Sequence, residues 1–192
     1  MQRVLLLISI LIMCFTLNAS EDDQTWEFKE WETSLISDRD GNTLRYITHG
    51  TITWGHQFGF IKQEGTCEKD LLWMTWSTYE KGIEKFKGEK VEFRIEVANE
   101  VFTVGIDLTN VHPFTSDIDV ALFTNFLANE SFIDLLKKGD EISISMVGPP
   151  QIVEAFDLPN ELFKLSGFSA NHLKAVEACK DPTVLNIPPR TR

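Results

Sequence analysis

Apolar and polar residues alternate along most of the chain, and this period of two predicts β-strands. The clearest case is the segment 91–97, in which apolar residues alternate with charged ones. A second alternating segment, 102–108, follows after the short connection Ala98-Asn99-Glu100. The two segments are therefore predicted to form a β-hairpin.

An aromatic-rich stretch lies at the centre of the predicted sheet. Within the stretch 52–79, the side chains of Trp54, His56, Phe58 and Phe60 fall on one side of an alternating segment and smaller residues fall on the other. Aromatic side chains recur at binding surfaces, so these four residues are the candidate binding surface. The alternative is that they fill the core of the sheet.

Other segments continue the β pattern on both sides of this centre. Further strands are predicted at 26–35, 43–48, 71–76, 117–123 and 142–146. The segment 71–76 is apolar on both sides, so it is expected inside the sheet and covered on both faces. The residues Asp38–Asn42 predict a hairpin turn. Their alternating oxygen side chains also resemble the start of a calcium loop, but the closing Glu is missing, which favours a plain turn.

Helical spacing appears only in the last third of the chain. Phe132, Leu135 and Leu136 share one face of a predicted helix over 130–138, and Gly139 follows as its stop.

A second helix closes the predicted domain. Ser169 is its expected N-cap, and Phe168 is expected to pack against Leu173. Leu173, Val176 and Cys179 would then share the inward face.

These elements predict a mainly β fold, either an antiparallel β-sandwich or a half-barrel, with two short helices at its margin. The sandwich is favoured, because alternation rather than continuous apolar runs dominates every strand outside 71–76. About 170 residues follow the N-terminal segment, which is enough for one domain with a substantial core. We expect a signal peptide over 1–20, a single β-rich domain over 21–182 and a disordered tail over 183–192.

The first 20 residues predict export. Arg3 precedes the apolar run Val4–Ile12, and small residues then lead into an acidic stretch. This order is typical of a secretory signal peptide, and the run is shorter than the roughly 17 residues that cross a bilayer. The cleaved chain is expected in the periplasm or outside the cell, with no transmembrane span. Acylation at Cys14 is the alternative, although Met13 is larger than the small residue expected before a lipidated cysteine.

Charge narrows the range of partners. Removing residues 1–20 takes away one positive charge and no acid, so the net charge changes from −11 to −12. Such a surface repels phosphate backbones, which disfavours nucleic-acid binding. A protein or another envelope macromolecule is the expected partner.

Two cysteines, Cys67 and Cys179, remain after cleavage. In an oxidising compartment an even pair within one small domain favours a disulfide. Two free thiols, too far apart to meet, are the alternative that spacing alone leaves open.

No group of residues identifies a reaction or a cofactor. The four histidines, at 49, 56, 112 and 172, match no zinc spacing. Neither a phosphate-binding glycine loop nor a dinucleotide fingerprint is present. Acidic pairs such as Asp117 and Asp119 are expected on a solvated face.

Three hypotheses for function remain. The first is a non-enzymatic binding protein. The second is a carrier of a small ligand, with an apolar cavity lined by Trp54, Phe58 and Phe60. The third is a hydrolase that uses His56 with a nearby carboxylate such as Asp70.

Three segments in the last third carry a resemblance to a known family. The segments 132–139, 142–146 and 163–170 resemble the carboxyl end of the invasion-associated locus B family of small secreted or periplasmic bacterial proteins. The resemblance implies a β-rich extracytoplasmic protein without catalytic activity, and it assigns no functional residues. Members of the family usually hold more than one cysteine pair, whereas this chain keeps one.

Overall fold

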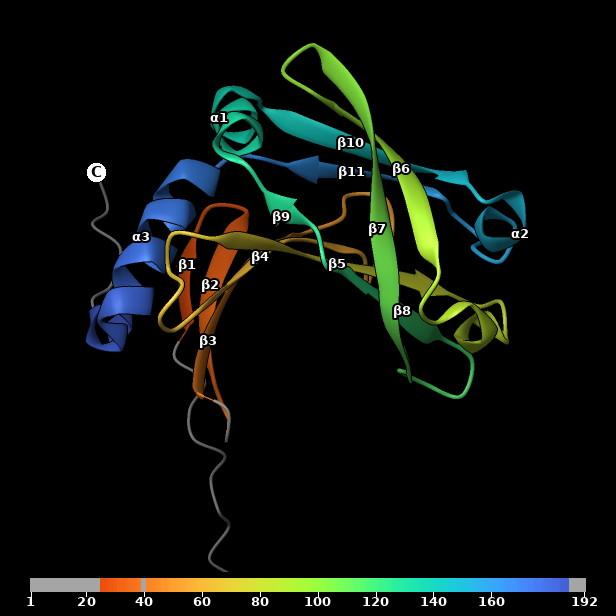
Figure 1. Cartoon of the computed structure of the whole chain (residues 1–192), viewed down its shortest axis with the longest axis horizontal. Coiled ribbons are helices and arrows are strands. Elements are labelled where there is room, and N and C mark those ends of the chain that lie inside the picture. The colour runs from red at the N-terminus through yellow and green to blue at the C-terminus, as the bar shows by residue number, and fades with distance from the viewer. Residues whose placement is uncertain (1–24, 39–40, 187–192) are drawn as a thin grey trace, which may run out of the picture.

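The computed structural model describes residues 25–38 and 41–186, which form one antiparallel sheet of eleven strands with short helices at its ends (Figure 1). The strands are β1 (Thr25–Phe28), β2 (Trp31–Asp38), β3 (Gly41–His49), β4 (Gln57–Gln63), β5 (Asp70–Thr78), β6 (Lys90–Val97), β7 (Glu100–Pro113), β8 (Asp119–Thr124), β9 (Leu127–Ala128), β10 (Glu141–Gly148) and β11 (Asn160–Lys164). The helices are η1 (Ile83–Phe86), α1 (Glu130–Lys138), α2 (Pro150–Val153), α3 (Phe168–Lys180) and η2 (Pro182–Asn186). The predicted mainly β, antiparallel fold class is confirmed.

The sheet curls so that its two ends face each other. Its strand order is β1-β2-β3-β4-β5-β8-β7-β6-β10-β11, and β9 pairs with β5. Three alternate carbonyl groups, those of Leu162, Lys164 and Ser166, accept hydrogen bonds from residues in or beside β2 and β3. The indole of Trp31 supplies one of them, 2.9 Å from the Lys164 oxygen. The sheet is therefore open and shaped like a half-barrel. Its two ends are joined by isolated hydrogen bonds rather than by continuous strand pairing.

One aromatic core joins both ends of the sheet. Phe163 of β11 lies 5.5 Å from the ring of Phe58 on β4 and 6.3 Å from that of Trp76 on β5. All three side chains are fully buried. Burying aromatic rings of this size contributes the largest apolar areas in a small domain, so this contact stabilises the curled shape.

The central strand β5 is covered more on one face than on the other. Leu72, Met74 and Trp76 are buried inside the curl, while Trp73 on the opposite side is half-buried beside the guanidinium of Arg45. The expectation that both faces of 71–76 are covered is therefore wrong for the outer face, where neighbouring side chains shield the strand only in part.

The predicted hairpin over 91–108 is confirmed as β6 and β7, which pair from Lys90 with Asp107 to Val97 with Glu100. Its turn is shorter than expected, since only Ala98 and Asn99 connect the strands. Both have positive φ, 49° and 66°. A two-residue hairpin turn of this kind follows the right-handed twist of its strands.

The first predicted helix is confirmed as α1. Asn129 caps it by accepting a hydrogen bond from the backbone N–H of Phe132, and Gly139 ends it. Phe132, Ile133 and Leu136 are buried, and Leu135 is half-buried. The short helix α2, which follows β10, was not predicted.

The second predicted helix, α3, exists but presents another face. It begins at Phe168, with Gly167 rather than Ser169 before its first turn. Leu173 is 59 % exposed, so its predicted inward position is wrong. The buried residues are Phe168, Asn171, Ala175, Ala178 and Cys179. Asn171 donates to the Phe28 carbonyl and bonds Thr33, so polar contacts and small residues set the register of this helix.

The predicted disordered tail begins too early. Residues 182–186 form η2, and Leu185 is buried against Trp26 and the disulfide region. The remaining tail, the predicted signal peptide with Cys14 and residues 39–40 of the predicted Asp38–Asn42 turn lie outside the described residues. On either side of these two residues, β2 and β3 pair antiparallel as far as Asp38 with Gly41, as a hairpin requires. Within the described ranges, no helix has the length and apolar character needed to cross a membrane.

Candidate functional site

Five large apolar side chains at one end of the sheet are exposed to solvent. They are Ile52 (60 %), Trp54 (68 %), Tyr79 (66 %), Phe114 (57 %) and Leu158 (45 %). They come from the loop between β3 and β4, the end of β5, the loop between β7 and β8 and the loop between α2 and β11. We call these five residues the aromatic patch. Exposed apolar clusters of this size are typical of interaction sites, which makes the patch the candidate site.

The structure separates the four residues of the predicted binding surface. Trp54 is exposed, whereas His56, Phe58 and Phe60 are fully buried. The alternating strand pattern does not extend back to Trp54, because β4 starts only at Gln57 and Gly55 has a φ of +89°. The left-handed backbone at this glycine turns the preceding residues out of the strand, so Trp54 points away from the core that its predicted partners fill.

A buried carboxylate holds the loop that carries Trp54. Glu161 of β11 is 1 % exposed and accepts hydrogen bonds from the backbone N–H groups of Ile52 (2.8 Å) and Thr53 (2.9 Å). His56 Nδ1 lies 3.0 Å from the same carboxylate. Gly50 leaves room for it, since a Cβ there would lie 2.5 Å from the carboxylate. Residue types and spacing gave no sign of this inward glutamate.

Hydroxyl groups on β5 hold the other side of the same loop. Ser77 Oγ donates to the Trp54 carbonyl at 2.8 Å, and Thr75 Oγ1 donates to the Gly55 carbonyl at 2.9 Å. With the bonds from Glu161, the loop is fixed on both sides. Trp54 is therefore exposed on a preorganised backbone, which lowers the entropy cost of binding.

His56 is a positioning residue beneath this loop. Its Nε2 lies 3.2 Å from the Ser77 carbonyl, and its ring packs against that of Trp76 at a tilt of 31°, with the ring centroids 4.3 Å apart. Burial lowers the pKa of His56 below its usual 6.5, and the bonds to Ser77 and Glu161 offset only part of this effect.

The hydrolase hypothesis placed His56 beside Asp70, and the structure gives each residue a different partner. His56 pairs with Glu161, whereas Asp70 pairs with Lys62, Tyr46 and His172. Because His56 and Glu161 are at most 1 % exposed, a substrate cannot reach either group in this conformation. Their arrangement serves to hold the loop.

Two hollows border Trp54, and Trp54 is the residue they share. The larger has a volume of about 320 Å³ and is lined by Trp54, Phe114 and the two histidines His49 and His112, among others. The smaller, about 140 Å³, lies toward Tyr79 and Leu158. Trp54 and Phe114 meet edge to face at 4.8 Å. The carrier hypothesis expected Phe58 and Phe60 to line such a cavity, and both belong to the core instead.

A second polar cluster lies under α3. Asp70 accepts hydrogen bonds from Tyr46 and Lys62, and His172 Nε2 lies 3.4 Å from its other oxygen. We call Tyr46, Lys62, Asp70 and His172 the Asp70 cluster. Burial raises the pKa of Asp70, but these three hydrogen bonds outweigh it, so the pKa lies below 3.8. Burial and the Asp70 carboxylate raise the pKa of Tyr46 well above 10.0, which keeps its hydroxyl as a donor.

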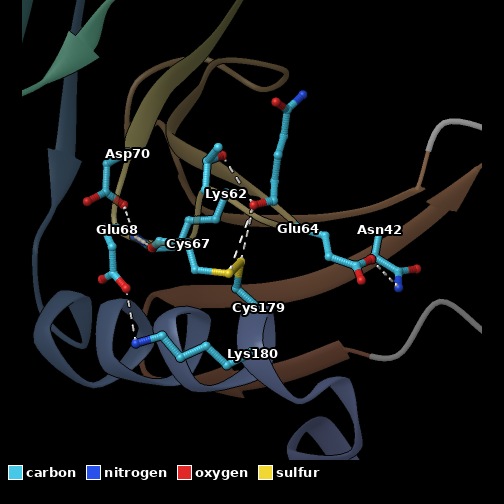
Figure 2. Close-up of a disulfide and its surroundings, with 10 residues drawn as sticks. Asn42, Lys62, Glu64, Cys67, Glu68, Asp70, Cys179 and Lys180 are labelled. Atoms are coloured by element: carbon cyan, nitrogen blue, oxygen red, sulfur yellow. Dashed lines mark hydrogen bonds and ion pairs between the residues drawn. A yellow bond between two sulfur atoms is a disulfide. The ribbon is translucent and has the colours of Figure 1, made fainter.

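The Asp70 cluster adjoins the two cysteines (Figure 2). Cys67 and Cys179 form a disulfide with their Cα atoms 5.6 Å apart. Lys62 Nζ donates to the Cys67 carbonyl at 3.0 Å, and Lys180 pairs with Glu68 at the surface. The disulfide and the Asp70 cluster together hold α3 against β4 and β5.

The four histidines lie in three different parts of the structure. Within residues 25–38 and 41–186, no three His, Cys, Asp or Glu side chains are placed to hold an ion. His49 and His112 line the larger hollow, and His172 belongs to the Asp70 cluster.

Sequence reasoning missed four members of the aromatic patch. Tyr79 and Phe114 follow the ends of strands, where alternation stops. One signal could have marked Phe114: it is an aromatic residue beside Pro113 and outside any periodic segment. Ile52 precedes the alternating segment that begins at Trp54, and Leu158 lies outside every predicted strand and helix. Only the curl of the sheet brings these positions together.

Comparison with known proteins supports the fold. No protein-family model and no curated protein sequence matches the chain. Among solved structures, the crystal structure of invasion associated protein B from Bartonella henselae is similar, with a TM-score of 0.51 and 11 % sequence identity. The match covers 82 % of this chain and 99 % of that one. The likeness therefore extends well beyond the last third, and at this identity it concerns the fold alone.

Proposed function

We propose that this chain is a non-enzymatic binding protein of the cell envelope or the extracellular medium, which contacts another macromolecule through the aromatic patch. The observation that carries the proposal is the exposure of Trp54, 68 %, on a loop that Glu161, Ser77 and Thr75 hold in place. Exposing an indole to water is unfavourable, and rigid exposed aromatics are typical anchors of interfaces.

Two further features are in keeping with this role. The order of charges and apolar residues over 1–20 predicts export, and a protein that acts outside the cytoplasm meets envelope or external partners. The structural neighbour is named as an invasion-associated protein, which fits an interaction role better than a catalytic one. Cell fractionation and N-terminal sequencing test the location, and we expect a mature terminus near Ser20 or Glu21.

Affinity capture with crosslinking tests the binding role. The mature protein is used as bait in envelope extract and culture medium, beside a Trp54→Ser/Phe114→Ser variant. A matched control is Leu173→Ser, which removes an equally exposed apolar residue from α3. We expect one or more partners that the wild type and the control retain and the patch variant loses. Capture that is equal for all three proteins, or absent after crosslinking, contradicts the proposal.

A further inference from the structure

We propose that the partner presents an extended, cationic stretch of polypeptide, which places two apolar side chains, two residues apart, in the hollows on either side of Trp54. This inference rests on the proposed function, because it names the class of partner for the same patch.

The two hollows fix the spacing of the apolar groups. Trp54 lines both, and no other residue is common to them. Thr75 lines the larger hollow and Ser77 lines the smaller one, and these residues are two positions apart on the same face of β5, so the two hollows are about 7 Å apart along the strand. In an extended chain, side chains on the same face are about 7 Å apart at positions i and i+2. An apolar-x-apolar segment therefore matches the site.

The polar groups in the hollows favour apolar occupants. The hydroxyls of Thr75, Ser77 and Thr78 already donate to protein acceptors, namely the Gly55 carbonyl, the Trp54 carbonyl and the Ala155–Asp157 region. A saccharide would need donors for its many hydroxyl oxygens; these three groups have committed theirs, which leaves few lining side chains such as Thr53, Gln57 and His49. Asp157 lines the smaller hollow but already accepts from Thr78 and the Tyr79 N–H. No carboxylate, ammonium or guanidinium lines the larger hollow, so a charged group placed inside it would lack an oppositely charged partner.

The surroundings of the patch favour positive charge on the partner. Four segments form this end of the molecule: 50–57, 77–82, 111–120 and 154–158. Their carboxylates are Glu80, Asp117, Asp119, Glu154 and Asp157. Their single ammonium, that of Lys81, already faces Asp119 at 3.4 Å. Charge complementarity therefore favours lysine or arginine beside the two apolar side chains.

Defined peptides test this inference. The probe is a fluorescently labelled Lys-Thr-Leu-Thr-Leu-Thr-Lys peptide. The matched peptide Lys-Thr-Thr-Leu-Leu-Thr-Lys has the same composition with adjacent leucines, and a third replaces both lysines by glutamates. Binding to the mature protein is measured by fluorescence anisotropy at low and high salt, with maltoheptaose as a competitor.

We expect the first peptide to bind at least about tenfold more tightly than either of the others, a difference of about 1.4 kcal/mol. Trp54→Ala should weaken it at least about tenfold, Leu173→Ala should leave it unchanged, and salt should weaken it. Equal affinity for both leucine arrangements, preference for the acidic peptide, displacement by the saccharide, or no binding of any peptide overturns the inference.

The capture experiment separates the two failures. One outcome is that capture depends on Trp54 and Phe114 while the peptides give one of the results that overturn the inference. In that case the patch binds a different class of partner, and only this inference fails. If capture does not depend on the patch, the proposed function fails as well.

Discussion

The His56–Glu161 pair and the Asp70 cluster are both buried polar groups inside the same curled sheet, yet they hold different kinds of structure. The pair fixes a loop whose side chains, Ile52 and Trp54, point into solvent. The Asp70 cluster fixes a helix that already packs through Phe168 and Ala175. The loop has little apolar burial of its own, so its position depends on hydrogen bonds, whereas α3 has a core contact and a disulfide as well.

This difference shows where the hydrogen bonds of a buried charge offset the free energy of its desolvation. Removing an ion pair from water is expensive, and apolar packing of the same volume is often as stable. Packing is an option under α3, but an exposed loop has no core side chains with which to pack. At the loop, directed bonds to backbone N–H groups are the means by which the fold can set the position of Trp54.

The largest expected effect on stability concerns the Asp70 cluster. Asp70→Asn leaves the Lys62 ammonium buried without its carboxylate, so we expect a loss of about 3–5 kcal/mol in the free energy of unfolding. The control Asp134→Asn removes an exposed partner of Lys137 and should change stability by less than about 0.5 kcal/mol. Urea denaturation measures both. Similar values for the two variants would show that the cluster contributes no more than a surface pair.

Next in size is the disulfide. Cys67→Ser or Cys179→Ser should lower stability by roughly 2–5 kcal/mol and loosen α3, because the bond closes a loop of 112 positions. Peptide binding at the distant patch should remain. Titration of the unfolded, non-reduced mature protein should find no free thiol, and two reactive thiols per chain would contradict the disulfide.

Glu161→Gln should lower the free energy of unfolding less than the two preceding changes and should weaken peptide binding more. The amide keeps the shape but replaces a carboxylate that accepts two backbone N–H groups of the loop, so we expect about 2 kcal/mol. Because the loop would lose its fixed position, peptide affinity should fall although the Trp54 side chain is unchanged. Unfolding curves and anisotropy are measured together, with Glu177→Gln on α3 as an exposed control away from the patch. Unaltered affinity would show that the loop holds Trp54 without the carboxylate.

The smallest effect is a dependence on pH. The pKa of His56 is lowered in the folded protein, so the unfolded chain takes up its proton first as the pH falls. This contribution to stability is complete above about pH 6.5 and is lost below it, by at most about 1.4 kcal/mol per pH unit. His56→Gln should flatten the slope below about pH 6.5 relative to the wild type. Equal slopes in the two proteins would contradict a lowered pKa.

Local pattern was sufficient for the elements that alternation or capping specifies. The β6–β7 hairpin, β10 and α1 follow from side-chain periods and from Gly139, because a strand or helix with one buried face repeats its burial along the sequence. Pattern failed at α3, where Leu173 is apolar but exposed and Asn171 is polar but buried. There the register depends on Thr33 and the Phe28 carbonyl, which lie more than 130 residues away along the chain.

The sequence by itself determined the fold class, the predicted export and the two cysteines available for pairing, because each depends on composition or on a short-range period. Tertiary structure alone decided which aromatics face water. His56, Phe58 and Phe60 look equivalent to Trp54 in the alternating stretch, but Gly55 and the Glu161 carboxylate divide them into a buried group and an exposed indole. Glu161 follows Gly55 by about a hundred positions, and only the curl of the sheet brings β11 beneath the loop. Periodicity describes neighbours along one element, so it cannot report a bond between the two ends of a sheet.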